Sequence, residues 1–174
     1  IQVNTNTSLY NGTVRAEVKV SKPVEYIILH AADTIKTSNP SVRLLADPNQ
    51  TEYSTGISFR YQPLELYVIP LKEKLAGTNQ TYSVEVSFEG KLFLDGTIGL
   101  YRGSYKDGNT TVNLAATQFE PTFARRVFPL FDEPQFKQII HLTVIHEESM
   151  RTTLSNMPVK ATVNYEATAG WLKT

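Results

Sequence analysis

Apolar and polar side chains alternate along much of this sequence, and a period of two residues is the pattern of a β-strand with one buried face. The clearest run is 14–20, where Val and Ala alternate with Arg, Glu and Lys. The Asn11–Gly12 pair before this run predicts a turn that opens the strand. The same pattern predicts further strands at 26–31, 57–61, 64–68, 82–88, 111–117, 139–145 and 161–167.

Helical signals are scarce in comparison. Residues 71–76 are expected to form one helical turn, and 121–126 a short helix that has Pro121 at its first position. Short strands punctuated by turns are typical of antiparallel β proteins. The sequence therefore predicts an all-β fold, an antiparallel β-sandwich or saddle-like sheet with one or two short helical turns.

A chain of 174 residues is long enough for one good hydrophobic core and short for two. No internal repeat, low-complexity segment or linker divides it, so we expect a single domain over residues 1–174. Cysteine is absent, which removes disulfides, thiolate nucleophiles and cysteine-ligated metals from consideration.

Charge and hydropathy narrow the range of partners. Lys and Arg together number 17, as do Asp and Glu, and basic runs are short, which argues against nucleic acid or an anionic membrane surface as the main partner. No apolar run approaches the roughly 20 residues that span a bilayer. The first residues lack the features of a signal peptide, so any export or anchor signal is expected to lie outside this segment.

Five N-x-[ST] sequons without proline stand at Asn6, Asn11, Asn49, Asn79 and Asn109. The composition alone predicts roughly two such triplets, although a Thr-rich β protein is expected to contain several by chance. We interpret the excess as the mark of a glycosylated ectodomain. This places the protein at the extracellular face of the plasma membrane or outside the cell.

The histidines do not form a recognisable metal site. His146 opens a sequence that begins like the zinc motif HExxH but has Met150 at its last position. His141 lies five residues before His146, an odd offset that sends strand side chains to opposite faces, and His30 stands alone. Nucleophile-elbow, P-loop and dinucleotide motifs are missing as well. We therefore expect no metal site and no complete active site in this chain.

One segment carries a specific resemblance. Residues 117–137, T-Q-F-E-P-T-F-A-R-R-V-F-P-L-F-D-E-P-Q-F-K, resemble the signature of the N-terminal domain of M1-family zinc aminopeptidases, the group related to aminopeptidase N. The resemblance covers nearly the whole chain and is sharp from 99 to 159. It implies a fragment that lacks the catalytic zinc domain, so that no cofactor is bound by this chain and zinc belongs to the parent protein. Both ends look cut within this domain.

The resemblance also implies a role for two side chains. Glu120 is expected to reach into the cleft and grip the substrate N-terminus, and Gln118 to line the first side-chain pocket. A carboxylate suits an α-ammonium group because charge-assisted hydrogen bonds are strong where water is excluded. An offset of two residues puts both side chains on the same side of an extended segment. In the alternative interpretation, Glu120 simply caps the turn at 121–126.

Four charged residues follow this pair. Arg125 and Arg126 precede Asp132 and Glu133 by a few residues, among several phenylalanines. An arginine fork suits bidentate pairing with a carboxylate. We therefore predict partly buried ion pairs that act as a scaffold and fix the angle of the segment carrying Gln118.

The favoured hypothesis is a non-catalytic N-terminal domain of a metalloaminopeptidase that removes N-terminal residues from peptides. Its partners would be its own catalytic domain and the peptide N-terminus. One alternative is the ectodomain module of a catalytically inactive M1-like receptor or adhesion protein that binds a protein partner. Another is an independent cell-surface sandwich. The motifs G-x-M-E-N and H-E-x-x-H-x18-E, sought in the rest of the parent, would separate the first two hypotheses.

Overall fold

A computed structural model describes residues 1–49, 51–150 and 152–174 of the chain. The expected all-β fold is confirmed: the described residues form strands connected by loops, with two short 3₁₀ turns. The strands are β1 (Gln2–Asn4), β2 (Leu9–Val20), β3 (Val24–His30), β4 (Ile35–Leu44), β5 (Phe59–Tyr61), β6 (Leu66–Leu75), β7 (Gln80–Lys91), β8 (Gly99–Asp107), β9 (Thr110–Gln118), β10 (Ile145–Glu147), β11 (Val163–Asn164) and β12 (Trp171–Lys173). The 3₁₀ turns are η1 (Gln62–Leu64) and η2 (Ala124–Arg126).

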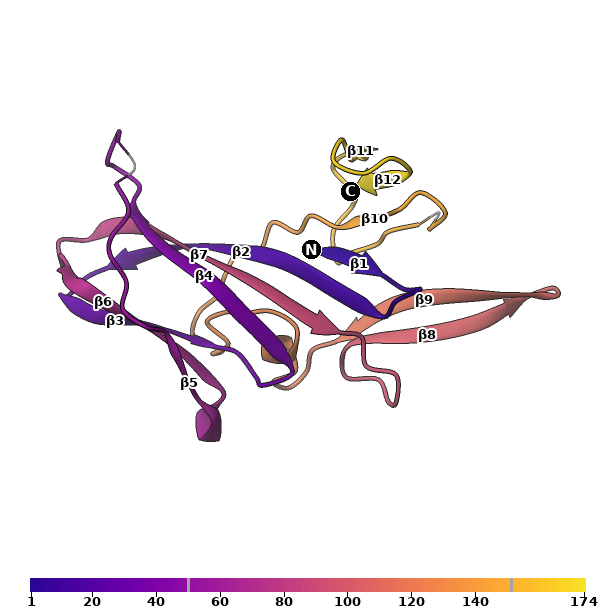
Figure 1. Ribbon diagram of the computed structural model, residues 1–174, viewed down its shortest axis with the longest axis horizontal. Coiled ribbons are helices and arrows are strands. Elements are labelled where there is room, and N and C mark those ends of the chain that lie inside the picture. The colour runs from indigo at the N-terminus through magenta and orange to yellow at the C-terminus, as the bar shows by residue number, and fades with distance from the viewer. Residues whose placement is uncertain (50, 151) are drawn as a thin grey trace.

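The residues that the structure describes form three sheets (Figure 1). The largest has seven strands in the order β11-β12-β10-β1-β2-β7-β4, and a smaller one has the order β3-β6-β5. Strands β8 and β9 form a separate two-stranded hairpin. The pairing is antiparallel except between β1 and β10, which run parallel.

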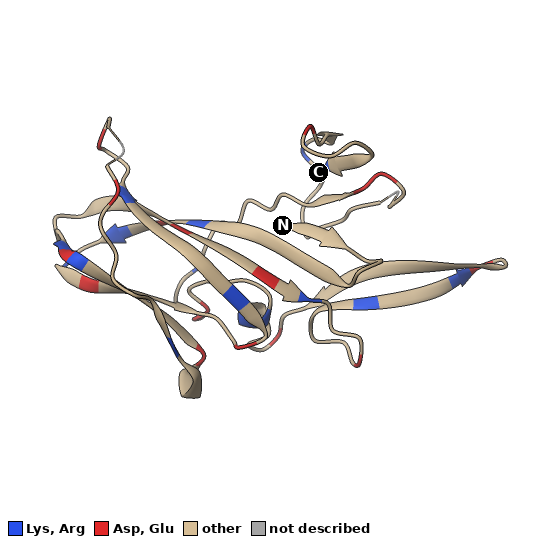
Figure 2. Ribbon diagram, viewed as in Figure 1, with Lys and Arg blue, Asp and Glu red and all other residues tan. Residues whose placement is uncertain are grey.

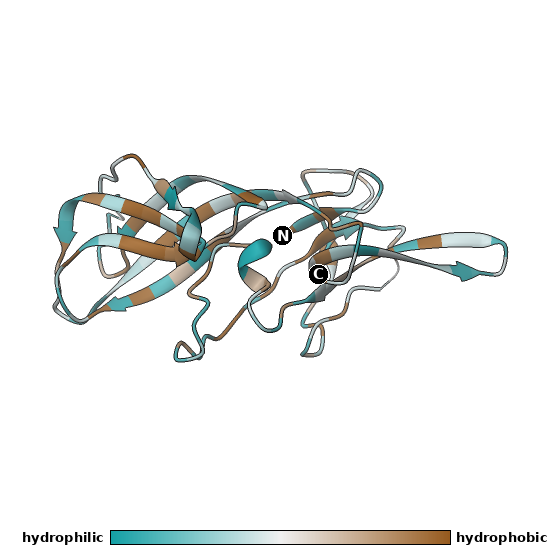
Figure 3. Ribbon diagram, turned by 90° about the horizontal axis from the view of Figure 1, so that it is seen from below, coloured by the Kyte–Doolittle hydropathy of each residue, from teal (hydrophilic) through white to brown (hydrophobic). Residues whose placement is uncertain are grey.

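The core lies between the seven-stranded sheet and the β3-β6-β5 sheet. Every second residue of β7 from Tyr82 to Phe88 is buried there, and these side chains meet Ile69 and Leu29 of the smaller sheet. Figure 3 shows apolar positions along strands of both sheets where the two approach. Full burial of a large apolar side chain stabilises a protein by about 1.5–3 kcal/mol, so this alternation selects the fold.

The β8–β9 hairpin projects from the body of the molecule (Figure 1). Its register is unbroken from the pair Gly99–Gln118 at the base to the pair Asp107–Thr110 at the tip. Gly108, with φ 57°, forms the tip, where a left-handed conformation favours glycine. The base is joined to the preceding loop by a bridge between Phe93 and Tyr101, so Gln118 lies next to the body of the molecule.

Two predicted strands are much shorter in the structure. Only Ile145 of the segment 139–145 belongs to a strand, and only Val163–Asn164 of the segment 161–167. Ile139 and Ile140 are 88% and 65% exposed. An alternating pattern makes a strand only when another strand offers hydrogen bonds. Val144 exchanges two backbone hydrogen bonds with Thr174 and Thr143 accepts one from Ile1, whereas residues 139–142 have no backbone ladder among the described residues.

Three boundary predictions were also wrong. Residues 71–75 continue β6 instead of forming a helical turn. The strand expected at 64–68 starts at Leu66, because η1 and the left-handed Glu65 (φ 52°) precede it. The helix expected at 121–126 is the three-residue turn η2, which begins after Pro121.

The prediction of a turn at Asn11–Gly12 was also wrong, because both residues lie inside β2 and pair with Glu89 and Phe88 of β7. A Cβ atom added to Gly12 would lie 2.7 Å from the Phe88 ring. Glycine is therefore needed here for a close approach between strands rather than for a turn.

Candidate functional site

The segment with the proposed substrate residues leaves the base of the hairpin. Gln118 is the last residue of β9, and Glu120 follows after one residue in a turn. Phe119 between them is partly buried and packs edge-on against Phe128, with ring centroids 5.8 Å apart. Gln118 and Glu120 are both exposed, so the Phe119 side chain packs inward while its two neighbours face outward.

The carboxylate of Glu120 has neither a hydrogen bond nor an ion pair within the described parts of the chain. The Gln118 amide donates a long hydrogen bond, 3.5 Å, to the backbone carbonyl of Glu120. Turn η2 has Phe123 at its N-cap position and no side-chain cap. Glu120 therefore does not cap this turn, and its charge faces solvent.

The backbone after Glu120 is held tightly. The N–H of Phe123 donates to the carbonyl of Phe119 at 2.7 Å, which closes the turn. The hydroxyls of Thr34 and Tyr10 both donate to the carbonyl of Arg126, at 2.9 and 3.3 Å. Burial raises the pKa of the Tyr10 phenol, so it stays a neutral donor.

Arg125 ties this turn to two other segments. Its Nε lies 2.7 Å from Asp132 Oδ2, and its Nη2 donates to the Asp132 carbonyl at 3.1 Å. Its Nη1 also lies 3.5 Å from Glu65 Oε2. The Arg125 side chain is 12% exposed and that of Asp132 is 18% exposed, so water screens the pair little.

Arg126 and Glu133, expected in the same network, have other partners. The guanidinium carbon of Arg126 lies 5.1 Å from the ring centroid of Phe123, and the Glu133 carboxylate accepts a hydrogen bond from Gln135. Neither side chain forms an ion pair among the residues that are described. Successive residues of a 3₁₀ turn lie about 120° apart, so Arg125 and Arg126 point in different directions.

Two members of this cluster could not be predicted from the sequence. Glu65 is far away in sequence, and its left-handed conformation after η1 brings it to Arg125. His30 exchanges two backbone hydrogen bonds with Leu130, and its Nδ1 accepts from the N–H of Asp132 at 3.3 Å. Both contacts depend on tertiary structure, and no local motif could have indicated them.

His30 is held in its neutral form. Burial lowers its pKa, and the charge of Arg125 acts in the same direction. The carboxylates of Asp132, Glu133 and Glu65 oppose this shift with weaker effects. A neutral imidazole is also what the contact requires, because Nδ1 can accept the hydrogen bond only when it carries no proton.

The other two histidines lie elsewhere. His146 is buried and bonds through Nε2 to the Thr174 hydroxyl at 3.1 Å, whereas His141 is exposed. No group of three or more His, Cys, Asp or Glu side chains within the described ranges is placed to hold a metal ion. The residues present therefore do not fit the zinc of the family that the sequence resembles.

All five sequon asparagines are exposed. Asn6, Asn79 and Asn109 lie in the connections β1–β2, β6–β7 and β8–β9, and Asn49 lies in the loop after β4. The middle residue of the Asn49 sequon, Gln50, lies outside the described residues. Asn11 differs from the others because it lies within a strand.

Acidic and basic residues are interspersed over the molecule (Figure 2), and exposed pairs such as Lys36–Glu89 join opposite charges across strands. None of the helical segments described in the structure is long and apolar enough to cross a bilayer.

The family model for the peptidase M1 N-terminal domain matches residues 1–174. The chain belongs to this M1 N-terminal domain family. Glutamyl aminopeptidase of Rattus norvegicus is 36% identical over 154 residues, which are 87% of this chain and 16% of that protein. Aminopeptidase N of Bos taurus is 31% identical over 176 residues, 98% of this chain and 18% of that protein. Endoplasmic reticulum aminopeptidase 2 of Bos taurus is 34% identical over 153 residues, which are 87% of this chain and 16% of that protein.

The M1 N-terminal domain thus spans less than a fifth of the length of these relatives, whose names describe aminopeptidases.

Proposed function

We propose that this M1 N-terminal domain supplies part of the site at which an intact aminopeptidase binds the N-terminus of a peptide. Glu120 would accept hydrogen bonds from the α-ammonium group, and Gln118 would contact the first side chain. The intact protein would remove N-terminal residues, and its own catalytic domain would be the partner that covers this segment. Zinc would be bound by that part of the protein, outside the present chain.

The observation that carries the proposal is the state of Glu120. Its carboxylate is exposed and without a partner among the described side chains, although it lies on a turn whose backbone is fixed by several hydrogen bonds. An unpaired charge on a fixed backbone is preorganised for a cationic ligand, because little ordering remains when the ligand binds. The Phe119–Phe128 contact and the Arg125–Asp132 pair provide the support.

The negative charge of Glu120 also suits the proposed ligand, a positively charged α-ammonium group. A hydrogen bond to a charged group contributes about 1.5–3 kcal/mol. Such a contact, if made by the α-ammonium, changes affinity roughly 10- to 150-fold. The neighbouring amide of Gln118 is uncharged and suits a side-chain pocket, where shape rather than charge decides.

The test is Glu120→Gln in the intact protein, which keeps the shape of the side chain and removes its charge. We expect kcat/KM for peptides with a free N-terminus to fall roughly 10- to 150-fold, with the melting temperature unchanged. Glu17→Gln is the matched control, since Glu17 is an exposed glutamate at the far end of β2. Unchanged kinetics for Glu120→Gln would contradict the proposal.

The exposed sequons support the proposal that the protein is a glycoprotein of the cell surface or the extracellular space. Carbohydrate on the asparagines of the native protein, measured by mass spectrometry of its peptides, would support this location. A native protein whose sequons are all unmodified would contradict it.

A further inference from the structure

The end of β3 is hydrogen-bonded to the segment that follows Glu120. Three successive N–H groups donate to carbonyls outside the strand, at 2.7–2.8 Å: His30 to Leu130, Ala31 to Glu65 and Ala32 to Arg125. The N–H of Leu130 also donates to the His30 carbonyl at 3.1 Å. Because η2 follows closely after Glu120 in the chain, these bonds hold the turn of Glu120 from its C-terminal side.

The imidazole of His30 adds a further bond to the same segment. Its Nδ1 accepts a hydrogen bond from the N–H of Asp132 at 3.3 Å, and its Nε2 has no hydrogen-bond partner within the described parts of the chain. When Nδ1 is the acceptor, the proton of the neutral ring lies on Nε2, so a second proton can only be added at Nδ1. Protonation therefore replaces the acceptor with a donor that faces another donor, the Asp132 N–H.

Charged groups from several segments face this partly buried ring. Burial lowers the pKa of His30 most strongly, and the positive charge of Arg125 in η2 acts in the same direction. The groups that raise the pKa, with smaller effects, are the carboxylates of Asp132, Glu133 and Glu65. A charged imidazole would thus stand close to Arg125, whose Nε lies 2.7 Å from Asp132 Oδ2. Protonation acts against the hydrogen bond to Asp132 and brings two positive charges together at once.

The path from the imidazole to the Glu120 carboxylate is short. Asp132 receives two hydrogen bonds from Arg125, which is part of η2. Turn η2 follows directly on the turn that the N–H of Phe123 closes by donating to the Phe119 carbonyl at 2.7 Å. A turn that loses its support on one side keeps its charged side chain less well preorganised, and a ligand must then restore the order when it binds.

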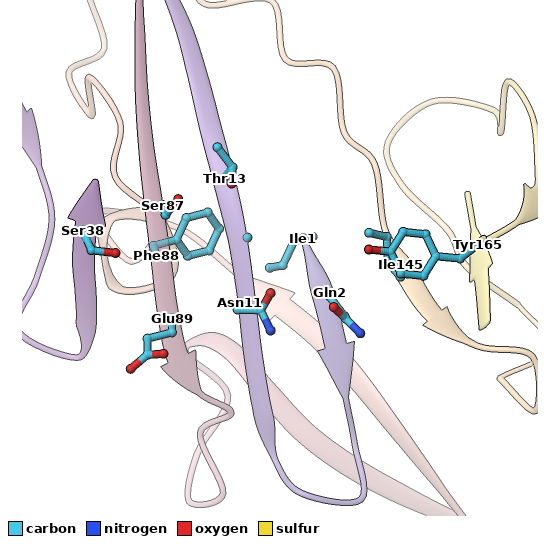
Figure 4. Close-up of a pocket in the computed structure, with 11 residues that line it drawn as sticks. Ile1, Gln2, Asn11, Thr13, Ser38, Ser87, Phe88, Glu89, Ile145 and Tyr165 are labelled. Carbon is cyan, nitrogen blue, oxygen red and sulfur yellow. The ribbon is translucent and has the colours of Figure 1, made fainter. Parts of the chain in front are cut away.

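This cluster is separate from the cavity shown in Figure 4, which is bounded by Ile1 and Tyr165. None of the residues bonded to His30 lines that cavity. The bonds of the cluster join residues between positions 30 and 132, and they rely on no residue at either end of the sequence.

We propose that His30 is a positioning residue: its neutral form holds the turn that carries Glu120, and its protonation loosens this turn and weakens binding of the peptide N-terminus. The inference rests on the proposed role of Glu120. Peptide binding is then sensitive to acid. Affinity is complete above the ordinary histidine pKa of about 6.5, and it declines as the pH falls through the lowered pKa of the folded protein.

The kinetic test measures kcat and KM of the intact protein for a peptide with a free N-terminus, from about pH 7.5 to about pH 5. Relative to His30→Asn, the wild-type KM should rise roughly 2- to 12-fold on the acidic side, the factor that one lost neutral hydrogen bond represents. The ratio of kcat values should change little, because the contact with the α-ammonium group is made in the bound substrate and in the transition state alike. Division by the variant's profile removes groups that titrate elsewhere in the protein.

Two substitutions of His30 separate its charge from its shape. His30→Asn keeps a neutral acceptor near the Asp132 N–H and should hold KM low across the pH range. His30→Ala offers no acceptor and should raise KM by a similar factor at every pH. His141→Asn is the matched control, since His141 is an exposed histidine outside this cluster, and its profile should follow that of the wild-type protein. Circular dichroism at each pH checks that the fold is retained.

Coupling to Glu120 is tested in the same assay. In a Glu120→Gln background, His30→Asn should no longer change the dependence of KM on pH, because the carboxylate that the turn positions has been removed. A change of the same size in both backgrounds would show that His30 acts on binding by another route, and it would overturn the proposal.

Hydrogen exchange tests the loosening of the turn without any peptide substrate. Exchange in the segment 119–133 of the intact protein is followed by mass spectrometry and corrected for the intrinsic effect of pH. Protection of this segment should fall below about pH 6.5 in the wild-type protein and persist in His30→Asn. Equal protection across the pH range, or the same loss in His30→Asn, would contradict the proposal.

The two proposals fail in different ways. If Glu120→Gln raises KM while the profiles of the wild-type protein and His30→Asn coincide, the positioning role of His30 is excluded and the role of Glu120 stands. If Glu120→Gln leaves the kinetics unchanged, the effect on peptide binding is excluded together with the role of Glu120. Hydrogen exchange then still decides whether His30 holds the turn.

Discussion

Tyr10 and Gly90 face one another across strands β2 and β7, and the Tyr10 ring fills the space that a side chain at position 90 would occupy. A Cβ atom added to Gly90 would lie 2.4 Å from the Tyr10 hydroxyl and 2.5 Å from the ring carbon that bears it. Tyr10 is 2% exposed and has little room to move. Its hydroxyl also donates to the Arg126 carbonyl, so this pair connects the core with the segment after Glu120.

Gly90→Ala is expected to lower the free energy of unfolding by about 1–3 kcal/mol, because the added methyl group overpacks a buried site. Denaturant unfolding monitored by circular dichroism measures the loss. Gly103→Ala is the control, since Gly103 is also a strand glycine but its nearest neighbour is the flexible Leu114 side chain at 3.1 Å. In a Tyr10→Leu background, the cost of Gly90→Ala should become smaller. Equal costs in both backgrounds would exclude the Tyr10 ring as the cause.

Arg125→Lys should destabilise the protein more than Arg126→Lys, although the two residues are neighbours in η2. A lysine at position 125 cannot reproduce the two bonds to Asp132, and a lost charged hydrogen bond costs about 1.5–3 kcal/mol. A lysine at position 126 can still lie over the Phe123 ring and so keep a cation–π contact. The melting temperatures of the two variants test the difference, and the reverse order would contradict it.

Arg60 holds the connection between β3 and β4. Its guanidinium donates to the carbonyls of Ala31, Ala32 and Ile35 at 2.7–2.9 Å. Burial lowers its pKa, which marks the cost of placing this charge here. Arg60→Lys leaves carbonyls without donors and should cost about 1–3 kcal/mol in thermal or denaturant unfolding.

Arg43→Lys provides the comparison for Arg60. Arg43 pairs with Glu52 at 2.8 Å with both side chains exposed, and such surface pairs contribute only about 0–1 kcal/mol. A loss at Arg43 as large as that at Arg60 would show that the bonds to the β3–β4 connection are not the source of the effect.

Acid should weaken the cluster around His30. Because its pKa is lowered in the folded protein, the unfolded chain takes up the proton first as the pH falls. The stabilising effect of neutral His30 is thus fully present above the ordinary histidine pKa of about 6.5, and it is lost as the pH falls from there toward the lowered value. Unfolding free energies measured across this window should decline on the acidic side.

His30→Asn keeps a neutral acceptor near Asp132 and should flatten this part of the pH profile. His141→Asn, at an exposed histidine, is expected to leave it unchanged. If His30→Asn retained the full pH dependence, another group would be responsible.

The long strands could be predicted from the sequence because their alternation reflects burial directly. In β2 exposed residues alternate with less exposed ones, and in β7 Tyr82, Val84, Val86 and Phe88 are buried, so the pattern and the structure largely coincide, although Ser83 is buried as well. Strand β4 escaped prediction because Asn39 and Pro40 interrupt a polar run, and the structure accommodates them with a register shift between Ser38 and Ser41. A bulge of this kind breaks the period of two on which the prediction depends.

The candidate site was likewise only partly predictable from the sequence. Gln118 and Glu120 were indicated by the resemblance of one contiguous segment. Their supports came from elsewhere: Glu65, His30 and Thr34 are distant in sequence and reach the segment only through the packing of β3, η1 and η2. Local patterns carry no information about such contacts.

The base and the tip of the β8–β9 hairpin are structurally independent of one another. Its base continues into the turn that carries Glu120, whereas its tip at Gly108 and Asn109 makes no contact that the base requires. Residues inserted at the tip would lengthen an arm in solvent without moving its root. Related proteins are thus free to diverge in hairpin length, and an experimenter can place a fluorescent label or an affinity tag there while the segment that carries Gln118 and Glu120 keeps its geometry.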